Sequence, residues 1–269
     1  MTSQRSNETK RPVRITTQSA TLDGDLVIPT GAQGVVLFAH GSGSSRFSPR
    51  NRYVGELLQA AGLATLLMDL LTPAEEAEDA QTGHLRFDIE LLAQRLIAAM
   101  DWLRGQPETR DLAAGYFGAS TGGGAALVAA AERPDLVRAV VSRGGRPDLA
   151  GAALAQVRAP TLLIVGGNDA PVIEMNRDAM RQMTSEVQLE IVAGATHLFE
   201  EPGTLQEVAR LAAEWFTTFL RSPAAAHSGS QAPAGSAVRR RVARAHRAQT
   251  ILNPTEEDLS VLPTSEGRP

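Results

Sequence analysis

The chain has 269 residues, of which 43% are apolar, and a formal net charge of −4. These values suit one globular domain and give no reason to expect nucleic acid as a partner of its core. The absence of cysteine excludes disulfides, thiolate nucleophiles and thiolate-bound metals. Because residues 1–17 are polar and no apolar run approaches 18 residues, we expect a cytoplasmic protein without a secretory signal or a membrane span.

Strand-like and helix-like segments alternate along residues 13–221, which we take as one domain preceded by a disordered segment, residues 1–12. Residues 13–28 show the alternation of an edge hairpin, and residues 187–191 that of a half-exposed last strand. A continuous apolar run, typical of a strand buried on both faces, occupies residues 34–39, and further strands are predicted at residues 64–68, 112–117, 136–141 and 161–165. Apolar residues at helical spacing lie between them. This alternation predicts an α/β fold with a mostly parallel, doubly wound sheet.

Three later segments add to this organisation. The acidic segment 72–88 is long enough to shield one side of a site, whereas residues 142–159 are too few to form a large lid. The last helix is predicted to begin with a capping box formed by Thr204 and Glu207. Residues 222–269 are rich in Ala, Ser, Pro and Gly and then in Arg, so we expect a low-complexity, disordered tail whose partner is unknown.

Ser120 is the candidate nucleophile. It lies in the sequence GASTG, residues 118–122, directly after a predicted strand and before a predicted helix of small residues. A sharp strand-to-helix turn of this kind exposes a serine hydroxyl at the edge of the sheet, and its small neighbours leave room for the turn. The alternative is a glycine-rich turn in which the serine is incidental.

His197 and Asp169 are the candidate partners of the serine. A serine hydroxyl needs a base, usually a histidine that is oriented by a carboxylate. His197 follows the last predicted strand, and Asp169 follows the strand before it, so both belong to loops at the carboxyl edge of the sheet. Asp169 could instead cap the next helix, and Asp148 is a weaker candidate for the acid. The order Ser, Asp, His along the chain is that of α/β-hydrolases.

Backbone amides that stabilise a developing oxyanion are expected at two places. One is the amide of Thr121, the residue that follows the nucleophile. The other is the amide of Ser42, in the loop HGSGSS at residues 40–45. His40 in this loop is expected to shape the loop and not to act as a base.

Three arginines are candidate ligands for an anionic group of the substrate. Arg143 and Arg146 follow the sixth predicted strand, and Arg46 follows the oxyanion loop. A guanidinium at this edge could bind a carboxylate or a phosphate through two hydrogen bonds. The alternative is that these arginines form surface ion pairs with the acidic segment 72–88.

The motifs HGSGSS, GASTG, GGNDAPV at residues 166–172 and GATH at residues 194–197 resemble those of the α/β-hydrolase superfamily, in its dienelactone-hydrolase-like branch. The resemblance covers about residues 13–221. It implies a single α/β-hydrolase domain with a minimal lid, an eight-stranded sheet with one antiparallel strand, and a triad of Ser120, Asp169 and His197. Dienelactone hydrolases proper use cysteine as the nucleophile, whereas position 120 is serine.

These observations predict a serine esterase that cleaves a small carboxylic ester or lactone, anionic substrates included, through an acyl-enzyme and without a cofactor or metal. An acyltransferase on the same fold is one alternative. A non-catalytic ligand-binding or scaffold protein is another, and it would leave Ser120 unreactive.

Overall fold

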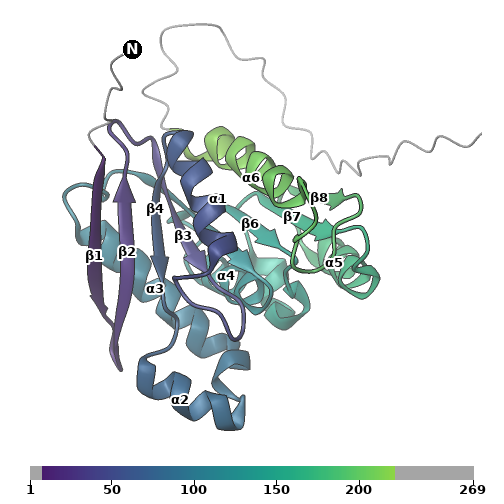
Figure 1. Cartoon of the computed structure of the whole chain (residues 1–269), viewed down its shortest axis with the longest axis horizontal. Coiled ribbons are helices and arrows are strands. Elements are labelled where there is room, and N and C mark those ends of the chain that lie inside the picture. Colours follow the sequence, from purple (N-terminus) through teal and green to yellow (C-terminus); the bar gives the residue numbers. More distant parts are fainter. Residues whose placement is uncertain (1–7, 222–269) are drawn as a thin grey trace, which may run out of the picture.

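The computed structural model describes residues 8–221, so the expected tail, residues 222–269, lies outside the described residues. Strands and helices alternate in one α/β domain (Figure 1). The strands are β1 (Thr9–Thr16), β2 (Thr21–Ile28), β3 (Gly34–Ala39), β4 (Ala64–Met68), β5 (Ala113–Ala119), β6 (Val137–Arg143), β7 (Thr161–Gly166) and β8 (Val187–Val192). The helices are α1 (Pro49–Ala60), α2 (Pro73–Thr82), α3 (Ile89–Gly105), α4 (Thr121–Glu132), α5 (Ala170–Gln182) and α6 (Thr204–Leu220), with short 3₁₀ segments η1 (Leu85–Phe87) and η2 (Pro147–Gln156).

The strands form one sheet in the order β1-β2-β4-β3-β5-β6-β7-β8. Strand β2 runs antiparallel to both of its neighbours, and all pairs from β4 to β8 are parallel. This confirms the predicted mostly parallel, eight-stranded sheet with one antiparallel strand. Because the carboxyl ends of the parallel strands meet at one edge, the loops that follow them can converge on a common site.

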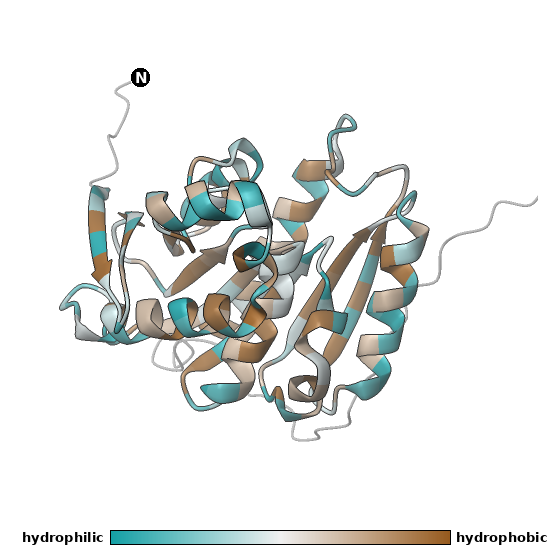
Figure 2. Ribbon diagram, turned by 90° about the horizontal axis from the view of Figure 1, so that it is seen from below, coloured by the Kyte–Doolittle hydropathy of each residue, from teal (hydrophilic) through white to brown (hydrophobic). Residues whose placement is uncertain are grey.

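Helices cover both faces of the sheet. Helices α1 and α6 lie next to each other on one face, and α3, α4 and α5 cover the other (Figures 1 and 2). Alternate residues of the buried strands supply the two apolar layers: in β3, Leu37 faces one layer and Phe38 the other. The sheet is therefore a rigid support between two packed layers, and the loops at its carboxyl edge are held by it.

Two predicted boundaries differ from the structure. Strand β1 begins at Thr9, so residues 9–12, expected to be disordered, pair with residues 25–28 of β2. These residues are mostly exposed and carry no apolar alternation, which is why the pattern did not reveal them. The capping box predicted at α6 is also wrong, because Gly203 precedes the helix and the Thr204 hydroxyl donates to the carbonyl of Glu201.

Two segments lie close to the carboxyl edge of the sheet. Only η2 lies between β6 and β7, so no large insertion covers this part of the edge. Helix α2 and η1 occupy the acidic segment between β4 and α3, and a true capping box of Thr72 and Glu75 fixes the start of α2. Among the helices described, none is long and apolar enough to cross a membrane.

Candidate active site

Ser120 lies at the turn between β5 and α4, with φ 50° and ψ −121°. Few residues other than glycine adopt a positive φ, so this backbone conformation is strained. The neighbours must be glycines: a Cβ at Gly118 would lie 2.6 Å from the Cα of Gly123, and one at Gly122 would lie 2.3 Å from the carbonyl oxygen of Ala39. The close packing of β3, β5 and α4 thus holds Ser120 in the strained turn.

The turn after β6 connects the serine with the histidine. The backbone N–H of Ser120 donates to the carbonyl of Arg143 at 3.2 Å, and the N–H of Arg146 donates to the carbonyl of Ser120 at 3.0 Å. Gly144, between these two arginines, has φ 50°, and a Cβ there would lie 3.5 Å from Nδ1 and Cε1 of His197. The imidazole therefore packs against the turn that is hydrogen-bonded to Ser120.

Asp169 and His197 contact each other directly. Nδ1 of His197 lies 2.7 Å from Oδ2 of Asp169. Asp169 occupies the N-cap position of α5, but its side chain makes no capping hydrogen bond, so the carboxylate is available to the imidazole. A proton held on Nδ1 by this carboxylate leaves the lone pair of Nε2 free to accept a proton.

The loops that carry Asp169 and His197 are joined by backbone contacts. The N–H of Asn168 donates to the carbonyl of Ala195, and its side-chain amide donates to the carbonyl of Gly194, both at 2.9 Å. At the end of β7, a Cβ on Gly166 would lie only 2.5 Å from the carbonyl oxygen of Ala195. The glycine therefore permits the close approach that brings the acid to the base.

The oxyanion loop lies against the serine. A Cβ on Gly41 would be 3.1 Å from the Cβ of Ser120. The backbone N–H of Ser42 donates to the hydroxyl oxygen of Thr121 at 3.0 Å, and Thr121 is the buried first residue of α4. The structure thus brings the two predicted oxyanion residues together, and it places the Thr121 hydroxyl in front of the Ser42 amide.

His40 shapes this loop. Its Nε2 accepts a hydrogen bond from the N–H of Leu70 at 3.0 Å, so the proton of the ring is on Nδ1, which donates to the carbonyl of Gly41 at 2.9 Å. Burial lowers the pKa of His40 and keeps the ring neutral. With both ring nitrogens in use, His40 connects the oxyanion loop to the end of β4, as its position in the sequence predicted.

A cleft of about 590 Å³ opens beside the oxyanion loop. Ser42 and Thr121 line it, together with residues of α2 and η1, whereas the side chains of Ser120, Asp169 and His197 do not. The cleft thus lies beside the oxyanion loop, and residues of the segment 72–88 also line it.

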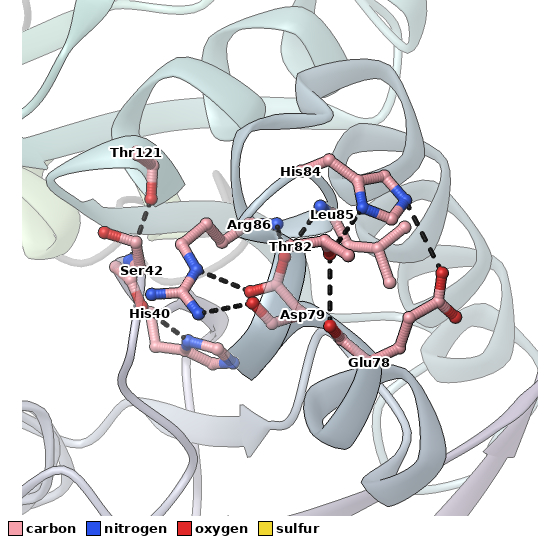
Figure 3. A network of polar contacts seen from close by, with 10 residues as sticks. His40, Ser42, Glu78, Asp79, Thr82, His84, Leu85, Arg86 and Thr121 are labelled. Carbon is pink, nitrogen blue, oxygen red and sulfur yellow. Dashed lines mark hydrogen bonds and ion pairs between the residues drawn. The ribbon is translucent and has the colours of Figure 1, made fainter.

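Sequence reasoning missed Arg86, which lines this cleft. Its Nε lies 2.5 Å from Oδ2 of Asp79, which is buried, and its guanidinium is drawn between Asp79 and the loop of Ser42 (Figure 3). Arg86 is the single arginine in the acidic segment 72–88, and that isolated basic residue was the available signal.

Two of the three predicted substrate arginines are engaged with carboxylates. Arg46 forms an ion pair with Asp69, and Arg146 donates to both carboxylate oxygens of Asp148 at 2.8 and 2.7 Å. Both partners lie outside the acidic segment 72–88. The second of these pairs also shows that Asp148, the weaker candidate for the acid, binds Arg146 of its own loop.

Arg143 has a different environment. It is the last residue of β6, not a loop residue as predicted, and only 8% of its surface is exposed. Its Nε and Nη1 are buried without a hydrogen-bond partner, and no carboxylate pairs with it in the part of the chain that the structure describes. Its guanidinium carbon lies 5.9 Å from the centre of the Phe199 ring. Burial, with a smaller effect of the Arg50 charge, lowers the pKa of Arg143 to about 10, so it is charged at neutral pH.

A carboxylate–imidazole pair, an exposed-turn serine and backbone donors are the groups needed for acyl transfer. Within residues 8–221, no group of three or more histidine, aspartate and glutamate side chains is arranged to hold a metal ion.

Known proteins show the same organisation. The solved dienelactone hydrolase of Anabaena variabilis is 64% identical, with a TM-score of 0.78, and the match covers 80% of this chain and 99% of that one. The esterase Est1E of Butyrivibrio proteoclasticus, also solved with ferulic acid bound, shares the fold at 16% identity, with a TM-score of 0.64, over 77% of this chain and 98% of its own.

Two curated relatives from Mycobacterium tuberculosis strains are each 61% identical over 200 residues, and both carry the provisional name phosphoribosyl transferase. The match covers 74% of this chain but only 44% of each relative, so the chain spans less than half of their length. The model of the dienelactone hydrolase family matches residues 22–222. That range contains every strand from β3 to β8 and all the candidate site residues, and the chain therefore belongs to the dienelactone hydrolase family.

Proposed function

We propose that the chain is a serine hydrolase that cleaves a small carboxylic ester or lactone through an acyl-enzyme. The observation that carries this proposal is the 2.7 Å contact between Asp169 and His197, beside a serine held at positive φ. The esterase neighbours and the family membership support hydrolysis as the type of reaction.

In the proposed mechanism, Nε2 of His197 takes the hydroxyl proton of Ser120 while the oxygen attacks the carbonyl carbon. The tetrahedral intermediate collapses, and His197 returns the proton to the leaving alcohol. Asp169 holds the imidazole in the required tautomer and stabilises its charged form. Water then attacks the acyl-enzyme by the same route in reverse, which releases the acid.

Serine in place of cysteine at position 120 has a chemical consequence. A thiol loses its proton far more readily than an alcohol, so a serine depends more strongly on a base within reach. The close pairing of Asp169 with His197 meets that need. We therefore assign the nucleophile to Ser120 itself.

We assign to Arg143 the role of binding an anionic group on the substrate. A buried charge without a partner is costly, and it is expected where a ligand completes its environment. Arg143 fits this role because Arg46 and Arg146 are already paired with carboxylates. The preferred substrate is then an ester or lactone that also carries a carboxylate or phosphate.

Phosphoribosyl transfer is not proposed for this chain. The relatives that carry this name are more than twice as long as the stretch they share with it. The greater part of that stretch must overlap residues 22–222, which match the dienelactone hydrolase family. We therefore base the proposed function on the family match and not on that name.

The decisive experiment uses a fluorophosphonate probe together with a panel of small esters, lactones and thioesters. We expect the probe to label Ser120, and Ser120→Ala to lose on the order of 10⁶ in kcat. An added alcohol that captures most of the acyl group would indicate an acyltransferase. An unlabelled Ser120 and no turnover of any substrate would indicate a binding protein and would overturn the proposal.

A further inference from the structure

The hydrogen bond between Ser42 and Thr121 raises the question of which groups face the oxyanion. An amide nitrogen carries one proton, and the proton of Ser42 is directed at the Thr121 hydroxyl oxygen at 3.0 Å (Figure 3). Thr121 is only 2% exposed, and both residues line the cleft. The single proton of the Ser42 amide is therefore already engaged with the Thr121 hydroxyl.

The hydroxyl of Thr121 keeps an unused proton. It accepts from Ser42, and no acceptor for its own proton is found among the described residues. Three of the four other buried threonines differ, because the hydroxyl donates to a nearby backbone carbonyl, at distances of 2.7–3.0 Å, in Thr109, Thr161 and Thr204. The fourth, Thr65, accepts from the side-chain amide of Gln59 and lies away from the cleft. At position 121 the hydroxyl proton is thus free to meet a ligand.

The backbone amide of Thr121 also has no hydrogen-bond acceptor within residues 8–221. The first N–H groups of a helix have no partner within that helix, and Thr121 is the first residue of α4. The amide and the hydroxyl of one residue can bind the same oxygen atom. The positive end of the α4 dipole lies at the same place and favours a negative charge there.

We propose that the oxyanion is bound by the amide and the hydroxyl of Thr121, and that the Ser42 amide acts through that hydroxyl. Hydrogen bonds in such a chain strengthen one another, because the Ser42 N–H polarises the hydroxyl that donates to the oxyanion. Thr121 is then a catalytic residue through its side chain, and Ser42 is a positioning residue. This inference presupposes the proposed serine hydrolase activity.

The alternative is that the Ser42 amide binds the oxyanion directly and the Thr121 hydroxyl turns away when the substrate arrives. Thr121→Val separates the two, because valine keeps the shape of threonine and removes the hydroxyl. If the Thr121 hydroxyl is a donor, we expect kcat to fall by about 10²–10³, as for loss of one oxyanion donor, with little change in KM. If the Ser42 amide is the direct donor, the variant frees that amide and kcat is maintained or rises, which would overturn the inference.

A tetrahedral inhibitor supplies a second readout that a purely structural role would not move. A trifluoromethyl ketone forms an adduct with the serine that carries an oxyanion, so its Ki should rise in Thr121→Val by about the factor lost in kcat. Thr121→Ser, which keeps the hydroxyl, should restore both values. Thr109→Val is the matched control: it removes a buried hydroxyl that donates to the carbonyl of Leu103 in α3, so it should lower stability without changing kcat or Ki.

Labelling of Ser120 and binding of the ketone separate a wrong oxyanion assignment from a wrong hydrolase assignment. If the fluorophosphonate labels Ser120 in the wild type and in Thr121→Val, and the inhibitor binds both equally, the inference is wrong and the hydrolase stands. If Ser120 is not labelled in the wild type and the ketone does not bind to it, the proposed function fails, and the inference fails with it.

Discussion

Gly166 offers a direct test of how the site is assembled, because it contributes no functional group. A Cβ at this position would lie 2.5 Å from the carbonyl oxygen of Ala195 and 2.6 Å from that of Thr196, whereas ordinary contacts begin at 3.4 Å. Both atoms belong to the backbone and cannot swing aside. In Gly166→Ala the two loops must therefore separate by about 0.8–0.9 Å, the shortfall from ordinary contact.

That displacement is enough to break the pair of Asp169 and His197, which lie 2.7 Å apart and are carried by these two loops. A misplacement of about 1 Å costs on the order of 10² in rate, and overpacking costs about 1–3 kcal/mol of stability. We expect kcat for a p-nitrophenyl ester, measured per Ser120 titrated with the fluorophosphonate, to fall by about 10². Gly105→Ala is the control, since no atom lies within 4 Å of its Cβ position. Wild-type kcat in folded Gly166→Ala would refute this account of the site.

Three further predictions concern single side chains. Asp169→Asn should lower kcat on the order of 10⁴, as in serine protease triads, with the melting temperature nearly unchanged; a loss of only a few fold would contradict the role of this acid. Arg143→Met removes a buried, unpaired charge, so the free energy of unfolding measured in urea should rise by about 1–4 kcal/mol. In the same variant, kcat/KM should fall for anionic esters and not for neutral ones. Equal losses on both kinds of ester would refute anion binding. Burial lowers the pKa of His40, so the unfolded state binds a proton more readily than the folded state. The free energy of unfolding should therefore fall as the pH drops below about 6.5. His40→Gln should weaken this pH dependence, and a variant with the pH profile of the wild type would contradict the role of His40.

Much of the fold could be predicted from the sequence. Buried parallel strands such as β3 and β7 are continuous apolar runs, because both of their faces are covered by helices. The sequence also predicted that Ser120, Asp169 and His197 lie at the same edge of the sheet, since each follows a strand whose direction sends its loop there. Such patterns lie within short stretches of the chain, so they can be recognised without knowing how the segments pack.

What the tertiary structure alone decided is which polar groups are already paired. Arg46, Arg143 and Arg146 look alike in the sequence, yet two contact carboxylates and the third is buried without one. In the same way, Ser42 and Thr121, 79 positions apart, were expected to offer two backbone amides, and only the structure shows that the amide of Ser42 donates to the hydroxyl of Thr121. Sequence patterns report periodicity and the order of elements, whereas the pairing of charges and hydrogen bonds depends on distances of a few ångströms between distant segments, which only the packed chain defines.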